Sequence, residues 1–158
     1  MEKKIIAMGN VVMCDDGIGI KVAEFLIDEF NSLGFKLLVG ETDIDYSIKS
    51  VENNDFMILL TPSYYDVSPG TITINLIDQV DINNCYLSQY SLDFLKSLNS
   101  NDFKVSGYII SIEASEFYFN PDLSPDLKVK FSEICNECLN HIKLISKLPE
   151  QYFNDSIA

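Results

Sequence analysis

The expected first strand passes into the expected first helix through the segment MGNVVMCDDGIG, residues 8–19. An apolar run, Ile5 to Met8, leads into this segment, and apolar residues recur at helical spacing after it. Two adjacent carboxylates, Asp15 and Asp16, stand at the junction together with three glycines. Open α/β sheets place their ligand sites in loops at the carboxyl ends of strands, so the segment predicts a functional site.

The two carboxylates admit two interpretations. At the start of a helix they are suited to capping and to the positive end of the helix dipole, and Asp15 is the expected N-cap. Alternatively, Asp15 and Asp16 offer oxygen ligands to a metal ion. Because neighbouring residues on a helix point in different directions, we expect one carboxylate to cap and the other to face a cleft.

The rest of the chain alternates between strand and helix patterns. The final helix is expected to follow Ser124 as its N-cap. This alternation predicts a three-layer α/β/α sandwich with a mostly parallel sheet. We expect a single domain over residues 1–147 and a tail over 148–158. The expected strands are 3–8, 35–39, 55–60, 70–76 and 104–112, and the expected helices are 16–31, 46–51, 88–98 and 126–147.

Charge and hydropathy exclude several classes of partner. The chain has 24 acidic residues and 11 basic ones, all lysine, for a net charge of -13. Nucleic-acid binding needs clustered positive charge, so we expect no nucleic-acid partner. No apolar run approaches the roughly 20 residues needed to cross a bilayer, and no signal peptide is recognisable. We therefore expect a cytoplasmic protein with no membrane partner.

Common cofactor and nucleophile motifs are missing from the sequence. The glycines match neither a dinucleotide fingerprint nor a phosphate-binding loop, and the single histidine, His141, lies in the last helix. Cys135 and Cys138 fall on the apolar face of that helix, which predicts core cysteines. A metal site formed by these two thiols and His141 is the alternative.

Several motifs, taken in order, resemble those of the [NiFe]-hydrogenase maturation proteases. They are Gly9-Asn10 with Asp15-Asp16-Gly17-Ile18-Gly19, then Gly40-x-Thr42, Pro69-Gly70-Thr71 and Leu123-Ser124-Pro125. That family consists of small α/β endopeptidases that remove the C-terminal extension of a hydrogenase large-subunit precursor. The likeness spans residues 3 to about 145. It implies a precursor protein as substrate, a monomer, and no permanently bound cofactor.

The resemblance also implies three side chains that recognise the nickel already inserted in the substrate. The acidic position of the first motif falls on Asp16, and an aspartate position after the third strand falls on Thr61. A histidine position falls on Ser88, or on Gln89 in a shifted register. Neutral hydroxyls are poor ligands for nickel-like ions, so only Asp16 is retained as a metal-contacting residue. Other positions expected to line the cleft are Gly9, Asn10, Asp15, Gly17 and Thr42.

Three further acids follow expected strands, namely Asp43, Asp66 and Glu113, and each is either a replacement ligand or a solvated loop acid. Two main hypotheses remain open. In the first, the chain is a maturation endopeptidase, Asp16 contacts the precursor's nickel, and the substrate supplies the other ligands. In the second, the chain is a catalytically inactive relative that binds a hydrogenase precursor, or another protein, as a chaperone or scaffold. An unrelated α/β domain for a small ligand is the third reading.

Overall fold

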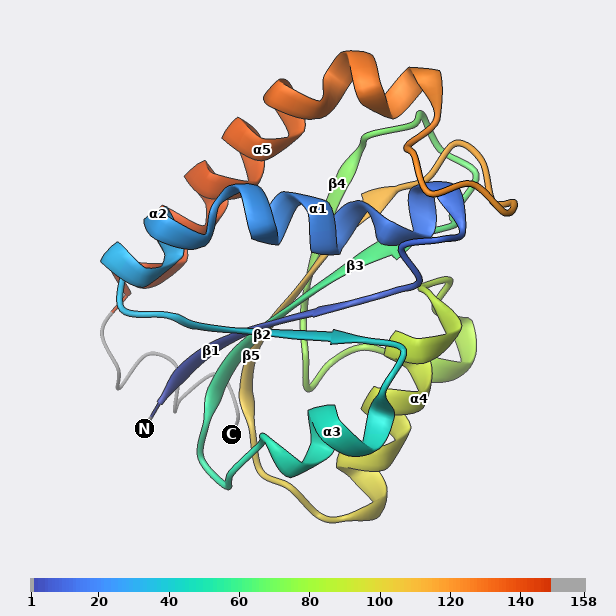
Figure 1. Cartoon of the computed structure of the whole chain (residues 1–158). Coiled ribbons are helices and arrows are strands. Elements are labelled where there is room, and N and C mark those ends of the chain that lie inside the picture. Colours follow the sequence, from blue (N-terminus) through green and yellow to red (C-terminus); the bar gives the residue numbers. More distant parts are fainter. Residues whose placement is uncertain (1, 149–158) are drawn as a thin grey trace.

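The computed structural model describes residues 2–148, and Figure 1 shows its α/β/α layers. A five-stranded sheet forms the central layer, with the strand order β2-β1-β3-β5-β4. The strands of this sheet are β1 (Lys3–Met8), β2 (Lys36–Glu41), β3 (Phe56–Ser63), β4 (Ile72–Leu76) and β5 (Ser106–Glu113). The expected tail lies outside the described residues except for Leu148.

Helices cover both faces of the sheet. Helices α1, α2 and α5 lie on one face, and α3 and α4 lie on the other (Figure 1). The expected three-layer sandwich is confirmed. The helices are α1 (Ile18–Phe25), α2 (Ile27–Ser32), α3 (Ile44–Lys49), α4 (Gln89–Ser100) and α5 (Pro125–Ser146), with short 3-10 turns η1 (Cys14–Gly17) and η2 (Ile82–Asn84).

The sheet is mostly parallel, as predicted. β1 pairs in parallel with β2 and β3, and β3 pairs in parallel with β5; only β4 runs antiparallel, beside β5. The carboxyl ends of the four parallel strands therefore meet at one edge of the sheet. This is the edge where α/β folds place ligand sites.

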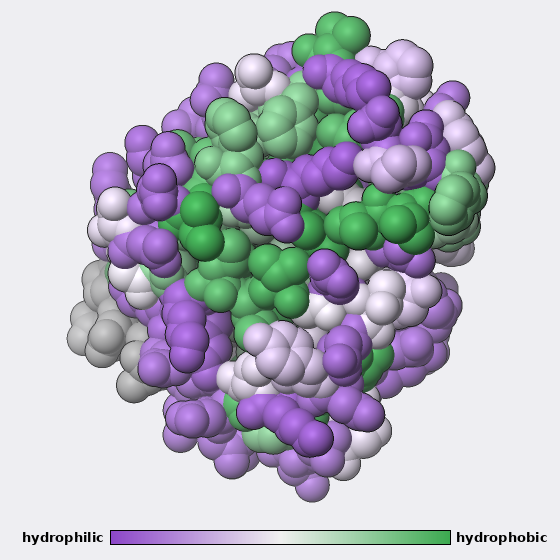
Figure 2. Space-filling model, in the orientation of Figure 1, coloured by the Kyte–Doolittle hydropathy of each residue, from purple (hydrophilic) through white to green (hydrophobic). Residues whose placement is uncertain are grey.

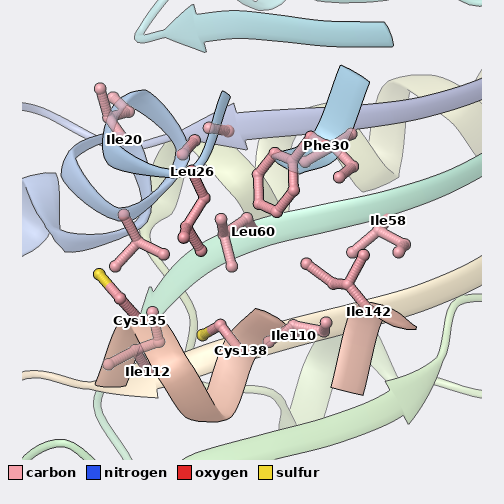
Figure 3. Packing of buried hydrophobic residues seen from close by; sticks show 14 of the residues in the cluster. Ile20, Leu26, Phe30, Ile58, Leu60, Ile110, Ile112, Cys135, Cys138 and Ile142 are labelled. Atoms are coloured by element: carbon pink, nitrogen blue, oxygen red, sulfur yellow. The ribbon is translucent and has the colours of Figure 1, made fainter. Parts of the chain in front are cut away.

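Each face of the sheet buries its own apolar cluster. Figure 3 shows the cluster under α1, α2 and α5, where Phe30, Leu60, Ile110 and Cys138 converge. The second cluster packs under α3 and α4 and includes Phe94. Burial of this kind is the main stabilising contribution to a domain of this size.

The single helix expected over residues 16–31 is wrong: the segment is divided into η1, α1 and α2. The amides that open η1, just before the expected helix start, do not begin an α-helical ladder because they bond to carbonyls far away in sequence. Cys14 N–H donates to the Asn120 carbonyl at 2.8 Å and Asp15 N–H to the Glu116 carbonyl at 3.3 Å. At Leu26 the backbone leaves helical geometry, with φ -102° and ψ 12°, between α1 and α2.

The expectation that β3 ends before Thr61 is also wrong. β3 and β5 remain paired through Thr61 with Ser111 and Ser63 with Glu113, so polar residues continue both strands. Pro62 is tolerated inside β3 because β1 has ended there: the last β1–β3 pair is Ala7 with Leu60. The other element ends differ from the expected ones by a few residues.

Candidate functional site

Asp16 lies at the carboxyl end of β1, buried to 2 % exposure, and three donors surround its carboxylate. Oδ2 accepts the Asn10 N–H at 2.7 Å and the Ser88 hydroxyl at 3.3 Å. Oδ1 accepts the Tyr64 hydroxyl at 2.5 Å. The predicted residues Asn10 and Asp16, from the first loop, therefore come together with Ser88, which lies 72 positions after Asp16 in the sequence.

Tyr64 is a site residue that the sequence analysis missed. It follows Ser63, the last residue of β3, and its ring stacks edge-on against Phe117 at a centroid distance of 5.8 Å. Burial, together with the hydrogen bond to Asp16, raises the pKa of Tyr64 above its ordinary value. The hydroxyl is therefore neutral and donates its proton to the carboxylate. The sequence signal for Tyr64 is its position directly after the end of β3, but the expected strand ended at residue 60 and β3 continues to Ser63.

Asp15 does not cap the first helix, and the expected N-cap is wrong. Helix α1 begins after Gly17 without a side-chain cap. The Asp15 carboxylate is fully buried and accepts the Ser115 and Glu116 N–H groups at 2.9 and 3.0 Å. It also accepts the Ser124 N–H at 2.8 Å. Asp15 thus ties the loop after β5 and the start of α5 to the first loop, and does not line an open surface.

The glycines of the first loop are explained by close packing. Gly9 has φ +142°, and a Cβ atom there would lie 2.1 Å from the Asp16 carbonyl oxygen. A Cβ atom on Gly17 would lie 2.8 Å from Val11 Cα, and one on Gly19 would lie 2.8 Å from the Leu60 carbonyl oxygen. Contacts below 3.0 Å are not tolerated, so glycine is required for α1 to approach the loop and β3 this closely.

Thr61 and Ser88 both bring hydroxyls to the α4 side of the sheet. Thr61 is fully buried, and its Oγ1 lies 2.7 Å from the Ser91 Oγ on α4. Ser88 directly precedes α4 and reaches Asp16. Gln89 is exposed and donates instead to Asp93 at 3.0 Å, so of the two alternative positions Ser88 contacts the site. Within the described part of the chain, the Thr61 hydroxyl bonds to the Pro62 carbonyl and to Ser91, and not to Asp16.

Two other predicted positions lie at the same end of the sheet. The Asn10 side chain accepts the Val12 N–H at 3.1 Å and so shapes the turn that follows β1. Thr42 is exposed between β2 and α3. Asn10 therefore helps to hold Asp16, and Thr42 lies on the neighbouring loop.

The three candidate replacement acids serve other purposes. Asp43 caps α3 by accepting the Tyr46 N–H at 2.9 Å. Glu113 is buried and accepts the Ser63 hydroxyl at 3.0 Å together with three backbone N–H groups of the loop that follows β3. Asp66 is exposed on that loop. Within the described part of the chain, none of the three joins Asp16 in a group of acidic, cysteine or histidine side chains that could hold a metal ion.

The residues around Asp16 do not fit a resident metal ion. Within residues 2–148, no group of three or more histidine, cysteine, aspartate or glutamate side chains is placed to hold one. Both Asp16 oxygens already accept hydrogen bonds, and the hydroxyls of Thr61 and Ser88 are poor ligands. Cys135 and Cys138 lie in the core, as predicted, and burial raises the pKa of both thiols.

What the site offers chemically is one buried carboxylate held by a replaceable donor. Asn10 N–H is fixed by the backbone, whereas the Tyr64 hydroxyl belongs to a half-buried side chain. Among the described residues, no buried side-chain polar atom lacks a hydrogen-bond partner, so the hydrogen-bonding capacity of the Asp16 carboxylate is satisfied without a ligand. An incoming cationic or metal-bearing group would compete with Tyr64 for Oδ1.

Solved structures show the fold of this chain among known proteins. The hydrogenase maturating endopeptidase HybD from E. coli superimposes with a TM-score of 0.69 and 17% identity, over 90% of this chain and 93% of that one. The [NiFe] hydrogenase maturation protease HybD from Thermococcus kodakarensis gives a TM-score of 0.68 and 22% identity, over 93% and 100% of the two chains. The chain therefore has the fold of the [NiFe]-hydrogenase maturation proteases.

Two curated proteins match part of the sequence. The hydrogenase expression/formation protein HoxM of Azotobacter vinelandii is 30% identical over 77 residues, which are 48% of this chain and 37% of that protein. HupM of Azotobacter chroococcum mcd 1 is 29% identical over the same length. The match thus spans little more than a third of each relative, and no protein-family model matches the chain. The resemblance to hydrogenase maturation proteases predicted from the motifs is confirmed by these similar proteins.

Proposed function

We propose that the protein acts in hydrogenase maturation, as an endopeptidase-like protein that removes the C-terminal extension of a nickel-loaded [NiFe]-hydrogenase large-subunit precursor. The observation that carries the proposal is the buried Asp16 carboxylate, held at the carboxyl end of the sheet by the Gly9–Gly19 loop. The fold shared with known maturation proteases and the partial match to HoxM and HupM support the same role.

The nickel in this proposal belongs to the substrate. The chain's own residues do not fit a resident metal, so the precursor supplies the remaining ligands and positions the scissile bond. Asp16 contributes one carboxylate, whose Oδ1 exchanges the Tyr64 hydroxyl for the nickel-bearing centre. Because Asp16 is 2 % exposed, this exchange requires Tyr64 to move aside.

A second candidate function is binding of the same precursor without cleavage, as a chaperone or scaffold. The specific observation in its favour is the replacement of two ligand positions by Thr61 and Ser88, whose hydroxyls already bond to Ser91 and Asp16. A protein of this kind retains the fold and the partner surface. It lacks a ligand set that holds the nickel centre in a reactive geometry.

Two further expectations accompany both candidates. We propose a cytoplasmic location and a monomer that meets one protein partner. Among residues 2–148, no helix combines the length and the hydrophobicity that crossing a membrane requires. Gel filtration with light scattering tests the monomer, and fractionation of cells producing the full chain tests the location.

The test of function separates cleavage from binding. The full chain is incubated with a nickel-loaded large-subunit precursor from the same organism, with the same precursor lacking nickel, and with Asp16→Ala as the control variant. The endopeptidase is supported if the intact mass of the nickel-loaded precursor falls by its C-terminal extension with wild type only. Stable binding without a mass change establishes the second candidate, and neither binding nor cleavage overturns both.

A further inference from the structure

Four apolar side chains are exposed together beside the Asp16 site. Val12 lies on the loop after β1, and Phe117, Tyr118 and Phe119 follow one another on the loop after β5; we call these four residues the aromatic rim. Their exposed fractions are 40%, 58%, 48% and 77%. Figure 2 shows hydrophobic residues at the right of the molecule, where Figure 1 places these two loops.

The aromatic rim is held firmly although it is exposed. The two loops bond to each other through Asn120, whose N–H donates to the Val12 carbonyl at 2.9 Å and whose carbonyl accepts the Cys14 N–H at 2.8 Å. The Asp15 carboxylate fixes the amides of Ser115 and Glu116, just before the three aromatic residues. The loops therefore present the rim in one conformation, which lowers the entropy cost of docking.

The rim is continuous with the candidate site. Phe117 packs edge-on against Tyr64, and Tyr64 donates to Asp16. A partner segment that covers the rim is therefore two side-chain contacts from the carboxylate. Aromatic side chains with this degree of exposure, gathered on fixed loops, are typical of binding hot spots rather than of a solvated surface.

The charge around the rim indicates what the partner carries. Glu116 is exposed directly before the aromatic run and makes no ion pair among the described residues, and Asp66 is exposed on the loop after β3. The chain as a whole has a net charge of -13. A segment that combines apolar side chains with flanking lysine or arginine complements this surface.

We propose that the aromatic rim docks an apolar, positively flanked segment of the large-subunit precursor and so brings the precursor's metal centre to Asp16. This inference rests on the proposed function, because it takes the precursor as the partner. Docking at the rim supplies affinity that a single carboxylate cannot. Docking at the rim also gives a reason for the role of Asp15, whose carboxylate holds the loop after β5 that carries the rim.

The rim is tested by measuring how tightly the nickel-loaded precursor binds to variants with substitutions at exposed rim positions. Phe119→Ser and Val12→Ser remove exposed apolar groups that are not needed for the core. The matched control is Leu144→Ser, because this side chain is 63% exposed near the C-terminal end of α5, whereas the rim loop leads into the N-terminal end of that helix. Loss of an apolar hot spot weakens binding by about 10-fold, so the rim variants should show Kd values raised by at least that factor and the control none.

A second readout does not depend on a substitution. Backbone amides within residues 116–119 of the wild-type protein should exchange hydrogen more slowly when the precursor is bound. Raising the salt concentration should weaken the complex because the flanking charges are screened. If the Kd is unchanged in the rim variants and hydrogen exchange of residues 116–119 is unchanged on binding, docking at the rim is overturned while the proposed function stands. If wild type does not bind the precursor, the proposed function fails and the inference fails with it.

Discussion

The Tyr64 hydroxyl lies 2.5 Å from Oδ1 of Asp16, at the end of the sheet where four parallel strands terminate. The bond joins the residue after β3 to the loop after β1, across 48 positions of sequence. It occupies the carboxylate oxygen that the backbone leaves free. The Tyr64 hydroxyl therefore covers Oδ1 of Asp16, and the Tyr64 ring contacts Phe117 of the aromatic rim.

Removing this hydroxyl should destabilise the protein. Tyr64→Phe deletes a hydrogen bond to a buried carboxylate, and bonds to charged groups contribute about 1.5–3 kcal/mol. We expect the free energy of unfolding in urea at pH 7 to fall by that amount. Tyr118→Phe is the control, because it removes a hydroxyl from an exposed ring. Equal losses in the two variants would contradict the role assigned to Tyr64.

The same bond predicts a dependence of stability on alkaline pH. Because the folded protein raises the pKa of Tyr64 above 10.0, the unfolded chain releases this proton first as the pH rises. The stabilisation is complete below pH 10 and is lost progressively above it. Wild type should therefore lose unfolding free energy faster than Tyr64→Phe between about pH 9.5 and pH 11. Parallel curves would show that the Tyr64 pKa is not raised.

Asp15 and Asp16 should respond differently to the same substitution. Asp15→Asn turns an amide group toward backbone N–H donors that cannot reorient, so we expect a loss of at least about 3 kcal/mol in unfolding free energy. Asp16→Asn should cost less, because the Tyr64 hydroxyl can rotate and accept from the new amide. Hydrogen exchange at Ser115, Glu116 and Ser124 should accelerate in Asp15→Asn only. Acceleration in both variants would contradict this division of roles.

Two glycines with positive φ separate backbone strain from steric contact. Gly34 has φ +86° with open space around it, whereas Gly9 has φ +142° with the Asp16 carbonyl in the way. Gly34→Ala should cost about 1–2 kcal/mol from left-handed strain alone. Gly9→Ala should cost more than about 3 kcal/mol, because the backbone must also shift. Urea unfolding measures both, and similar losses would show that the loop relaxes freely.

Restoring the two lost ligands should create a metal site. Ser88 already contacts Asp16, so Ser88→His combined with Thr61→Asp should place an imidazole and a carboxylate near it. By titration calorimetry, we expect wild type to bind Ni²⁺ or Cd²⁺ weakly and the double variant to bind at least about 100-fold more tightly. Residues that only support metal ligands change metal affinity by about 10- to 100-fold, and direct ligands should contribute at least as much. Gln89→His with Thr61→Asp is the control, because Gln89 points to solvent and Asp93. A gain in the control instead would favour the shifted register.

Much of the fold was predictable because its signals are local. The apolar run of β3 and the helical spacing of α5 identify buried elements, and the Ser124 cap accepts the Leu127 N–H as expected. The 3-10 turn η1 and the continuation of β3 through Thr61 were not predictable. Both depend on partners far away in sequence, namely Asn120 for the turn and Ser111 for the strand.

The site was predictable only in part, for the same reason. The glycines and paired acids of the first loop marked Asp16, and the family spacing marked Ser88. Local capping rules assigned Asp15 wrongly, because the N–H groups that donate to its carboxylate lie about 100 residues away in sequence. Tyr64 carries no motif at all. Its role follows from the strand end that brings its hydroxyl to Asp16.

The proposed cleavage is tested most directly by the intact mass of a nickel-loaded large-subunit precursor after incubation with this protein. Wild type should remove the C-terminal extension, and the mass should stay unchanged with Asp16→Ala or when the precursor lacks nickel. The mass should also stay unchanged with buffer alone. A nickel-loaded precursor that keeps its extension with wild type, while an established maturation protease removes it, would contradict the claim of cleavage.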